Sequence, residues 1–215
     1  MQVRFLNNNE KLIASKLVND IVNILKLDGV LALQTDTVPG LTCNIRSIVA
    51  LKKIYAAKQR SIKKPCAIFV NSIDSISYFA KLNTIEHKLL TRFFPGALTL
   101  VLELKKPLVY DSLGLWGDYI GIRSPNDTFI LDIIAKLGCP LFATSMNLSG
   151  CKPVNKWQDL SKNMCNNIDL YVDRAVYSDG DRNVASSVVQ VVDDKIIVIR
   201  EGVITKEAMC KAIDE

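Results

Sequence analysis

The spacing of apolar and polar positions along the chain predicts helices and strands that interleave. Helical periodicity, with an apolar residue about every fourth position, indicates helices at residues 10–27, 47–58, 72–80, 84–94, 128–137 and 205–213. Short apolar or alternating runs indicate strands at residues 30–34, 66–70, 98–104, 119–123, 140–144, 169–173, 186–192 and 195–200. This interleaving predicts an α/β fold with one main sheet.

Polar side chains cluster where three of these strands end. Residues 35–37 (TDT) follow the first strand, Arg123 ends the strand at residues 119–123, and residues 144–147 (TSMN) follow the strand at residues 140–144. Open α/β sheets hold their ligands in loops at strand ends, so these clusters are candidate site residues. For residues 144–147 alone, local hydroxyl and Asx turns explain the composition equally well.

Two cations, Lys58 and Arg60, lie where the helix at residues 47–58 is expected to end. On a continuing helix two side chains at this spacing would diverge, but on a chain that is leaving the helix both can face one anion. Cations in a last turn also offset the helix dipole. The residues alone leave both explanations open.

The composition is that of a folded protein with a mild positive charge. The 215 residues are 49% hydrophobic and 23% charged, and 27 basic against 22 acidic side chains give a net charge of +5. This charge suits a nucleotide or RNA but does not require one. No segment has the pattern of a secretion signal or a membrane helix, so we expect a cytoplasmic protein without membrane contact.

The sequence lacks the familiar motifs for metal binding and nucleophilic catalysis. The six cysteines form no C-x-x-C pair and His87 is the single histidine, so neither a zinc site nor a disulfide framework has the required spacing. Neither G-x-x-x-x-G-K-[ST] nor G-x-G-x-x-G occurs, so a nucleotide would be held in another way. The absence of G-x-S-x-G disfavours acyl-enzyme chemistry.

Seven short motifs follow one another along the chain: QTDTVPGL (34–41), KQR (58–60), PGALTLVL (95–102), IRSPND (122–127), SMNLSG (145–150), SSVVQV (186–191) and IREGVI (199–204). In order and register they resemble the YrdC family of L-threonylcarbamoyladenylate synthases. Members of that family carry P-T-[DE]-T-V-Y-G-L, K-x-R, P-G-P-L-T-[FL]-V-L, V-R-x-P, S-A-N-x-S-G, S-T-V-V-D and L-R-P-G-A-I. The resemblance runs from about residue 11 to residue 213.

The resemblance implies a single YrdC-like domain over residues 1–215, in which a twisted mixed sheet flanked by helices surrounds a large basic cavity. It implies a reaction of L-threonine, bicarbonate or CO2, and ATP to threonylcarbamoyl-AMP and pyrophosphate, for N6-threonylcarbamoyladenosine in tRNA. A threonylcarbamoyl transferase complex downstream and weak binding of tRNA or other RNA are further expectations. Mg²⁺ is expected on the triphosphate, held mainly by phosphates and water, with no metal bound by the protein itself.

The family motifs assign the nucleotide end of the reaction to five residues. By resemblance, Lys58, Arg60, Ser145 and Asn147 form the catalytic set and bind ATP. Arg200 matches the arginine of L-R-P-G and is a further nucleotide contact. We also expect Lys58 and Arg60 to face solvent on the cavity wall, so that replacing either with alanine would abolish turnover without disturbing the fold.

A second set of residues is assigned to threonine by the same resemblance. Arg123 would pair with the carboxylate, a charge-assisted contact worth roughly 1.5–3 kcal/mol. Thr35 would contact the polar end of the amino acid, and Ala143 would line the pocket. Either Ser186 or Ser187 would complete it.

The chain departs from the family pattern at five positions. Gln34 stands for a proline, Pro39 for a tyrosine, Met146 for an alanine and Glu201 for a proline, and Phe69 occupies a position where many members have histidine. These changes predict a reshaped amino-acid pocket, with the contacts of the family tyrosine and histidine absent or replaced.

Two alternative functions compete with this interpretation. An RNA-binding module could use the basic cavity without catalysis, although the chain has no RRM-type aromatic motif and only 7% aromatic residues. A related domain in carbamoyl-transfer maturation proteins adenylates carbamate without threonine, but those chains carry zinc-finger and acylphosphatase segments that do not fit in 215 residues.

Overall fold

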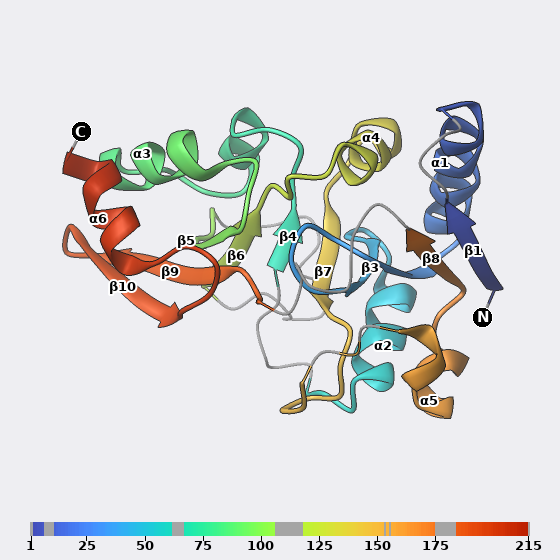
Figure 1. The fold of residues 1–215 in the computed structure, drawn as a ribbon. Helices are drawn as coiled ribbons and strands as arrows, with labels where there is room; N and C mark the ends of the chain where they lie inside the picture. The colour runs from blue at the N-terminus through green and yellow to red at the C-terminus, as the bar shows by residue number, and fades with distance from the viewer. Residues whose placement is uncertain are drawn as a thin grey trace.

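The computed structural model describes residues 2–6, 11–61, 67–105, 118–152, 154, 156–174 and 184–214. These residues form one ten-stranded mixed sheet in the order β1-β8-β2-β3-β7-β4-β6-β5-β9-β10, with helices packed against it (Figure 1). The strands are β1 (Gln2–Leu6), β2 (Val30–Leu33), β3 (Gly40–Asn44), β4 (Ala67–Phe69), β5 (Leu98–Glu103), β6 (Tyr119–Arg123), β7 (Leu141–Ser145), β8 (Leu170–Arg174), β9 (Ser187–Val192) and β10 (Lys195–Arg200). The helices are α1 (Lys11–Lys26), α2 (Ile48–Ala57), α3 (Thr84–Phe93), α4 (Thr128–Leu137), α5 (Lys162–Asn166) and α6 (Lys206–Asp214), with 3₁₀ turns η1 (Asp74–Tyr78) and η2 (Trp157–Asp159).

Local capping signals explain where the helices begin. Ser47 caps α2 by accepting the backbone N–H of Ala50 at 2.9 Å. Asn83 and Glu86 form a reciprocal capping box at the start of α3. Asp127 accepts two backbone N–H groups at the start of α4. The loop between β6 and α4, which follows Arg123, is therefore fixed at its far end.

Side chains alternate between the two faces of the sheet, and this alternation locates the site. In β5, Leu98, Leu100 and Leu102 enter the larger hydrophobic core, whereas Thr99 and Val101 point to the opposite face. Helices α1 and α4 pack on that opposite face over β2, β7 and β8. Over β5, β6 and β9 the same face is lined by cavity residues instead.

The α/β fold with a mixed sheet flanked by helices is confirmed, and most predicted elements appear within one or two residues of the expected bounds. The predicted helix at residues 72–80 is wrong: only the 3₁₀ turn η1 forms there. Ser75 and Ser77 each donate a side-chain hydrogen bond to the carbonyl three residues earlier, at 2.7 Å. Such bonds compete with α-helix formation.

Strands β1 and β3 were not predicted. Strand β3 follows the turn of residues 34–39 and pairs with both β2 and β7. Gly40, the first residue of β3, is of a type common in loops, but it fits inside the sheet because its backbone approaches the Thr144 carbonyl closely. Cys66, in the predicted strand at residues 66–70, lies outside the described residues. Among the described helices, none combines the length and apolar character needed to cross a bilayer.

Candidate active site

A cavity of about 330 Å³ lies over the strand ends, on the face that α1 and α4 leave open. This volume is at the lower end of the range of roughly 300–1,000 Å³ for ligand pockets. Seven of the nine residues assigned from the sequence line it: Thr35, Arg60, Arg123, Ala143, Ser145, Ser186 and Arg200. The other two, Lys58 and Asn147, lie behind the wall.

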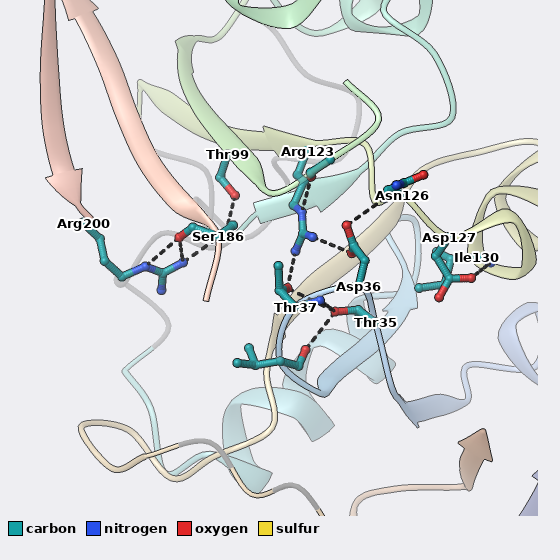
Figure 2. Close-up of polar contacts among 12 residues, drawn as sticks. Thr35, Asp36, Thr37, Thr99, Arg123, Asn126, Asp127, Ile130, Ser186 and Arg200 are labelled. Carbon is teal, nitrogen blue, oxygen red and sulfur yellow. Dashed lines mark hydrogen bonds and ion pairs between the residues drawn. The ribbon is translucent and has the colours of Figure 1, made fainter. Parts of the chain in front are cut away.

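The turn between β2 and β3 presents two buried threonines to the cavity. The Thr35 hydroxyl donates to the Val38 carbonyl at 2.9 Å and accepts the Thr37 N–H at 3.1 Å. The two threonine hydroxyls are 3.2 Å apart (Figure 2). Thr35 therefore shapes the turn with its hydroxyl while lining the cavity, a double role that its position in the sequence did not reveal.

Arg123 is buried at the end of β6 and is held on several sides. Its Nε donates to the Gly96 carbonyl at 2.9 Å, and its Nη1 donates to the Thr37 hydroxyl at 2.7 Å. Its Nη2 forms an ion pair of 2.5 Å with Asp36 (Figure 2). The guanidinium also lies 5.6 Å from the centre of the Phe69 ring, within cation–π range. The family histidine position is thus occupied by a ring that supports the arginine.

On the opposite wall, Arg200 and Thr99 reach the same serine (Figure 2). Arg200 donates from Nε and Nη2 to the Ser186 carbonyl at 3.1 and 2.8 Å, and from Nη2 to its hydroxyl at 3.2 Å. The hydroxyls of Thr99 and Ser186 are 2.9 Å apart. Burial, and then the positive charge of Arg123, lower the pKa of Arg200. The two arginines therefore repel each other across one cavity, and an anion between them would relieve that repulsion.

The structure separates the two serines that the sequence left as alternatives. Ser186 lines the cavity, whereas Ser187 is fully buried and bonds the loop after β10. The Ser187 hydroxyl donates to the Ile204 carbonyl at 2.5 Å and accepts the backbone N–H groups of Gly202 and Ile204. A Cβ on Gly202 would lie 2.2 Å from the Ala185 carbonyl oxygen, so only glycine allows this loop to pack behind Ser186.

The end of α2 sends its two cations in different directions. Gln59 adopts a left-handed backbone conformation (φ 48°), which turns Arg60 toward the cavity. The expectation that Lys58 faces solvent is wrong, since this residue is 1% exposed. Its Nζ donates to the Ser145 carbonyl and, at 2.8 and 2.9 Å, to the carbonyl and side-chain oxygens of Asn147. Lys58 thus fastens the turn after β7 to α2.

The departures from the family pattern have structural correlates. Pro39 is buried outside the cavity wall, and its carbonyl accepts the Met146 N–H at 2.8 Å. Met146 is fully buried in the core. Gln34 donates to Asp173 at 3.2 Å, away from the cavity lining. A backbone hydrogen bond therefore joins the residues that replace the family tyrosine and alanine, just before β3 and just after β7.

The sequence analysis missed Thr99 as a site residue, and it gave Asp36 no role of its own. Thr99 lies inside the quoted PGALTLVL motif, and strand alternation could have placed it opposite the core leucines. Asp36 lies between the two cavity threonines and was quoted within the polar cluster, but its partner is 87 residues away. No local signal in the sequence connects Asp36 with this partner, Arg123.

Comparison with known proteins identifies the family. Residues 23–202 match the model of the Sua5/YciO/YrdC family, which is described as "Telomere recombination". The match covers most of the chain, so the chain belongs to this family. This chain thus combines the family motifs with a cavity that several of the motif residues line.

Three known proteins illustrate the similarity. A Methanocaldococcus jannaschii protein, provisionally named threonylcarbamoyl-AMP synthase, is 34% identical over 82% of this chain and 81% of its own length. The threonylcarbamoyl-AMP synthase of Bacillus subtilis is 32% identical over 86% of this chain, but only 53% of its own length is matched. The crystal structure of P. abyssi Sua5 complexed with L-threonine superposes with a TM-score of 0.84 over 99% of this chain and 61% of that one. Its 24% identity supports a shared fold.

Proposed function

We propose that this protein is a threonylcarbamoyl-AMP synthase that joins L-threonine, bicarbonate or CO2, and ATP, and releases pyrophosphate. The observation that carries the proposal is that Arg60, Arg123 and Arg200 line one cavity. The chain is also about one third identical to relatives that carry this name. The chain spans only about half of several of these relatives, such as the mouse enzyme at 49%. The complete activity is therefore a proposal for this chain.

The chemistry requires positioned cations more than a reactive side chain. The threonine nitrogen attacks CO2, and a carbamate oxygen then displaces pyrophosphate in line at the α-phosphorus of ATP. Charge on the phosphate oxygens must be neutralised while the reactants are held in line. Arginine suits this task because its planar group pairs with carboxylates and phosphates and stays charged.

The two ends of the cavity suit the two ends of the reaction. Arg123, with Thr35 and Thr37 beside it, is the partner that we assign to the threonine carboxylate. Arg60 and Arg200 are assigned to the phosphates. Ala143 and Ser186 also line the cavity and are assigned to the threonine pocket.

Lys58, Ser145 and Asn147 act together in this proposal. The Ser145 hydroxyl donates to the Asn147 side-chain oxygen at 2.5 Å, and that oxygen also accepts from Lys58. Ser145 lines the cavity and is the member assigned to contact ATP. The assignment of Lys58 and Asn147 as direct ATP ligands stays a prediction, since the Lys58 amine and the Asn147 amide nitrogen donate to carbonyls of the protein.

Several further predictions from the sequence belong to the same proposal. Mg²⁺ would be bound by the triphosphate and water; within the described residues no three His, Cys, Asp or Glu side chains form a metal-binding group. Transfer of the product to a threonylcarbamoyl transferase complex, weak tRNA binding and a cytoplasmic location stay predictions. The same applies to the single domain over residues 1–215.

The test of the proposal is pyrophosphate release by the purified chain with ATP, Mg²⁺ and bicarbonate, with and without L-threonine. We expect release that depends on threonine. Release that is indifferent to threonine would overturn the amino-acid assignment, and no release would favour the non-catalytic RNA-binding module. A parallel arm with L-serine measures selectivity, because one methyl group is worth only about 1–3 kcal/mol.

Arg60 provides the variant for the nucleotide end. Arg60→Met should raise the ATP KM, because a charged phosphate contact is lost. Arg92→Met is the matched control, since Arg92 is an exposed arginine on α3 outside the cavity lining. Equal kinetics in the two variants would show that the phosphate site has been misplaced.

A further inference from the structure

Asp36 lies between the cavity threonines but does not itself line the cavity. Its Oδ1 pairs with Nη2 of Arg123 at 2.5 Å, and its Oδ2 accepts the backbone N–H of Asn126 at 2.9 Å (Figure 2). The side chains of the pair are only 12% and 5% exposed. One carboxylate thus joins the turn after β2, the end of β6 and the loop before α4.

This arrangement fixes the plane of the Arg123 guanidinium. The Gly96 carbonyl and the Thr37 hydroxyl accept from two of its nitrogens, and Asp36 is the charged acceptor for the third. All three bonds have a charged donor, and at Asp36 the acceptor is charged as well, so Coulomb attraction adds to that bond. Asp36 therefore contributes the strongest of the three anchors that aim this group.

We propose that Asp36 is a positioning residue for the amino-acid substrate: it holds Arg123 in the orientation in which that arginine receives the threonine carboxylate. The proposal rests on the proposed function and deepens it at the threonine end of the cavity. Asp36 acts through Arg123 and not by touching the substrate. Its removal should therefore affect the binding of threonine and leave the binding of ATP unchanged.

A purely structural role for Asp36 predicts a different result. Through Asn126 the carboxylate also supports the loop between β6 and α4. If support of that loop were its only contribution, Asp36 variants would lose stability and change both substrate constants together. The split between the two KM values separates the two roles.

The kinetic test compares Asp36→Asn, Asp36→Ser and Asp36→Glu with the wild type. In the two neutral variants we expect the threonine KM to rise about tenfold, with the ATP KM and kcat within about twofold. Asp36→Glu keeps the charge and should recover most of the threonine affinity. Either neutral variant suffices if the other does not fold. An unchanged threonine KM, a parallel rise of both KM values, or a glutamate variant no better than the neutral ones overturns the proposal.

Asp169→Asn is the matched control. Asp169 also bridges a backbone N–H and a cation, with Val30 N at 2.8 Å and Lys53 Nζ at 3.4 Å, but it lies outside the cavity lining. This variant should leave both KM values unchanged. A threonine-specific effect in Asp169→Asn would show that loss of any such bridge is sufficient, and would overturn the assignment to Asp36.

A second readout does not depend on turnover. Phenylglyoxal modification, followed by mass spectrometry of the peptides, should label Arg123 faster in Asp36→Asn than in the wild type, relative to the exposed Arg92. Equal relative rates would contradict the anchoring role. If the wild type shows no threonine-dependent pyrophosphate release, the proposed function fails, whereas the labelling result still decides whether Asp36 positions Arg123.

Discussion

Arg123 and Arg200 line the same cavity, but the protein treats their charges differently. Arg123 is buried against a carboxylate, with Asp36 as its ion-pair partner. Among the described residues, the hydrogen-bond partner of Arg200 is Ser186, which offers a neutral carbonyl and a hydroxyl. Burial and the charge of Arg123 lower the pKa of Arg200, which marks it as the less compensated cation.

Because of this difference, the two ends of the cavity suit ligands of different charge. Arg123 can still orient one substrate carboxylate, because hydrogen bonds from its guanidinium are directional. Its ion pair with Asp36 already offsets part of the cost of burying its charge. An arginine held by neutral groups gains more from a polyanion, because among the described residues no carboxylate is recorded as its partner. We therefore assign threonine to the Arg123 end and the phosphates to the Arg200 end.

The largest expected effect comes from Arg123→Met. The loss of a charge-assisted contact should lower kcat/KM for threonine about 10- to 150-fold, which corresponds to roughly 1.5–3 kcal/mol. The variant should also unfold at lower denaturant concentration, because Asp36 is left without its charged partner. Steady-state kinetics with each substrate varied in turn measures the first effect. An equal loss for ATP and threonine would contradict the division of the cavity.

Lys58→Met should lower stability in addition to removing the ATP contact that we propose for Lys58. The buried amine satisfies acceptors on Ser145 and Asn147, so its removal should cost about 2–3 kcal/mol in the free energy of unfolding. Arg60→Met, two residues on, should stay within about 0.5 kcal/mol of the wild type. Urea titrations of the two variants compare a buried cation with one on the cavity wall. Equal stabilities would show that Lys58 is not structural.

Gly202→Ala tests the Arg200 wall without touching a charge. The added Cβ would collide with the backbone of residues 185–187, and overpacking of this kind costs about 1–3 kcal/mol. The displaced loop should also raise the ATP KM, because the Ser186 carbonyl holds Arg200. Gly138→Ala is the matched control, because an added Cβ there would meet no other atom and only the backbone φ of 74° would be strained. Its stability should fall by about 1 kcal/mol with unchanged kinetics. The comparison fails if both variants alter the ATP KM.

Arg200→Met should give the smallest of the four effects. We expect the ATP KM to rise about tenfold, as for one charged phosphate contact of about 1.4 kcal/mol. Stability should hardly change, in contrast to Arg123→Met, because no carboxylate in the described part of the chain loses its partner. Parallel denaturation of the two arginine variants measures this contrast. A stability loss as large as that of Arg123→Met would show that Arg200 is also paired.

The sequence predicted the elements whose pattern is local and missed the features that depend on distant partners. Helices with capping signals, such as α4 after Asp127, were predicted within a residue. Strand β3 was missed because Pro39, just before it, and Gly40, its first residue, are typical of loops, and pairing with β2 and β7 makes Gly40 part of a sheet. The resemblance named seven residues that line the cavity, because the order of the motifs along the chain carries information that periodicity does not.

The roles of the charged residues could be assigned only from the three-dimensional structure. Lys58 and Arg60 are alike in sequence, but the left-handed Gln59 sends one into the core and the other to the cavity. The partner of Asp36 is far along the chain, so neither spacing nor composition could indicate that the carboxylate aims an arginine. Burial and ion pairing are properties of the folded packing, which a local pattern does not encode.

The most direct test of the account is the identity of the reaction product. Incubation of the wild-type chain with ATP, Mg²⁺, L-threonine and [¹³C]bicarbonate should yield threonylcarbamoyl-AMP that is heavier by the mass of one label, detected by mass spectrometry together with pyrophosphate. Omission of threonine should abolish both products. Pyrophosphate release without a labelled threonylcarbamoyl adduct would contradict the proposed reaction.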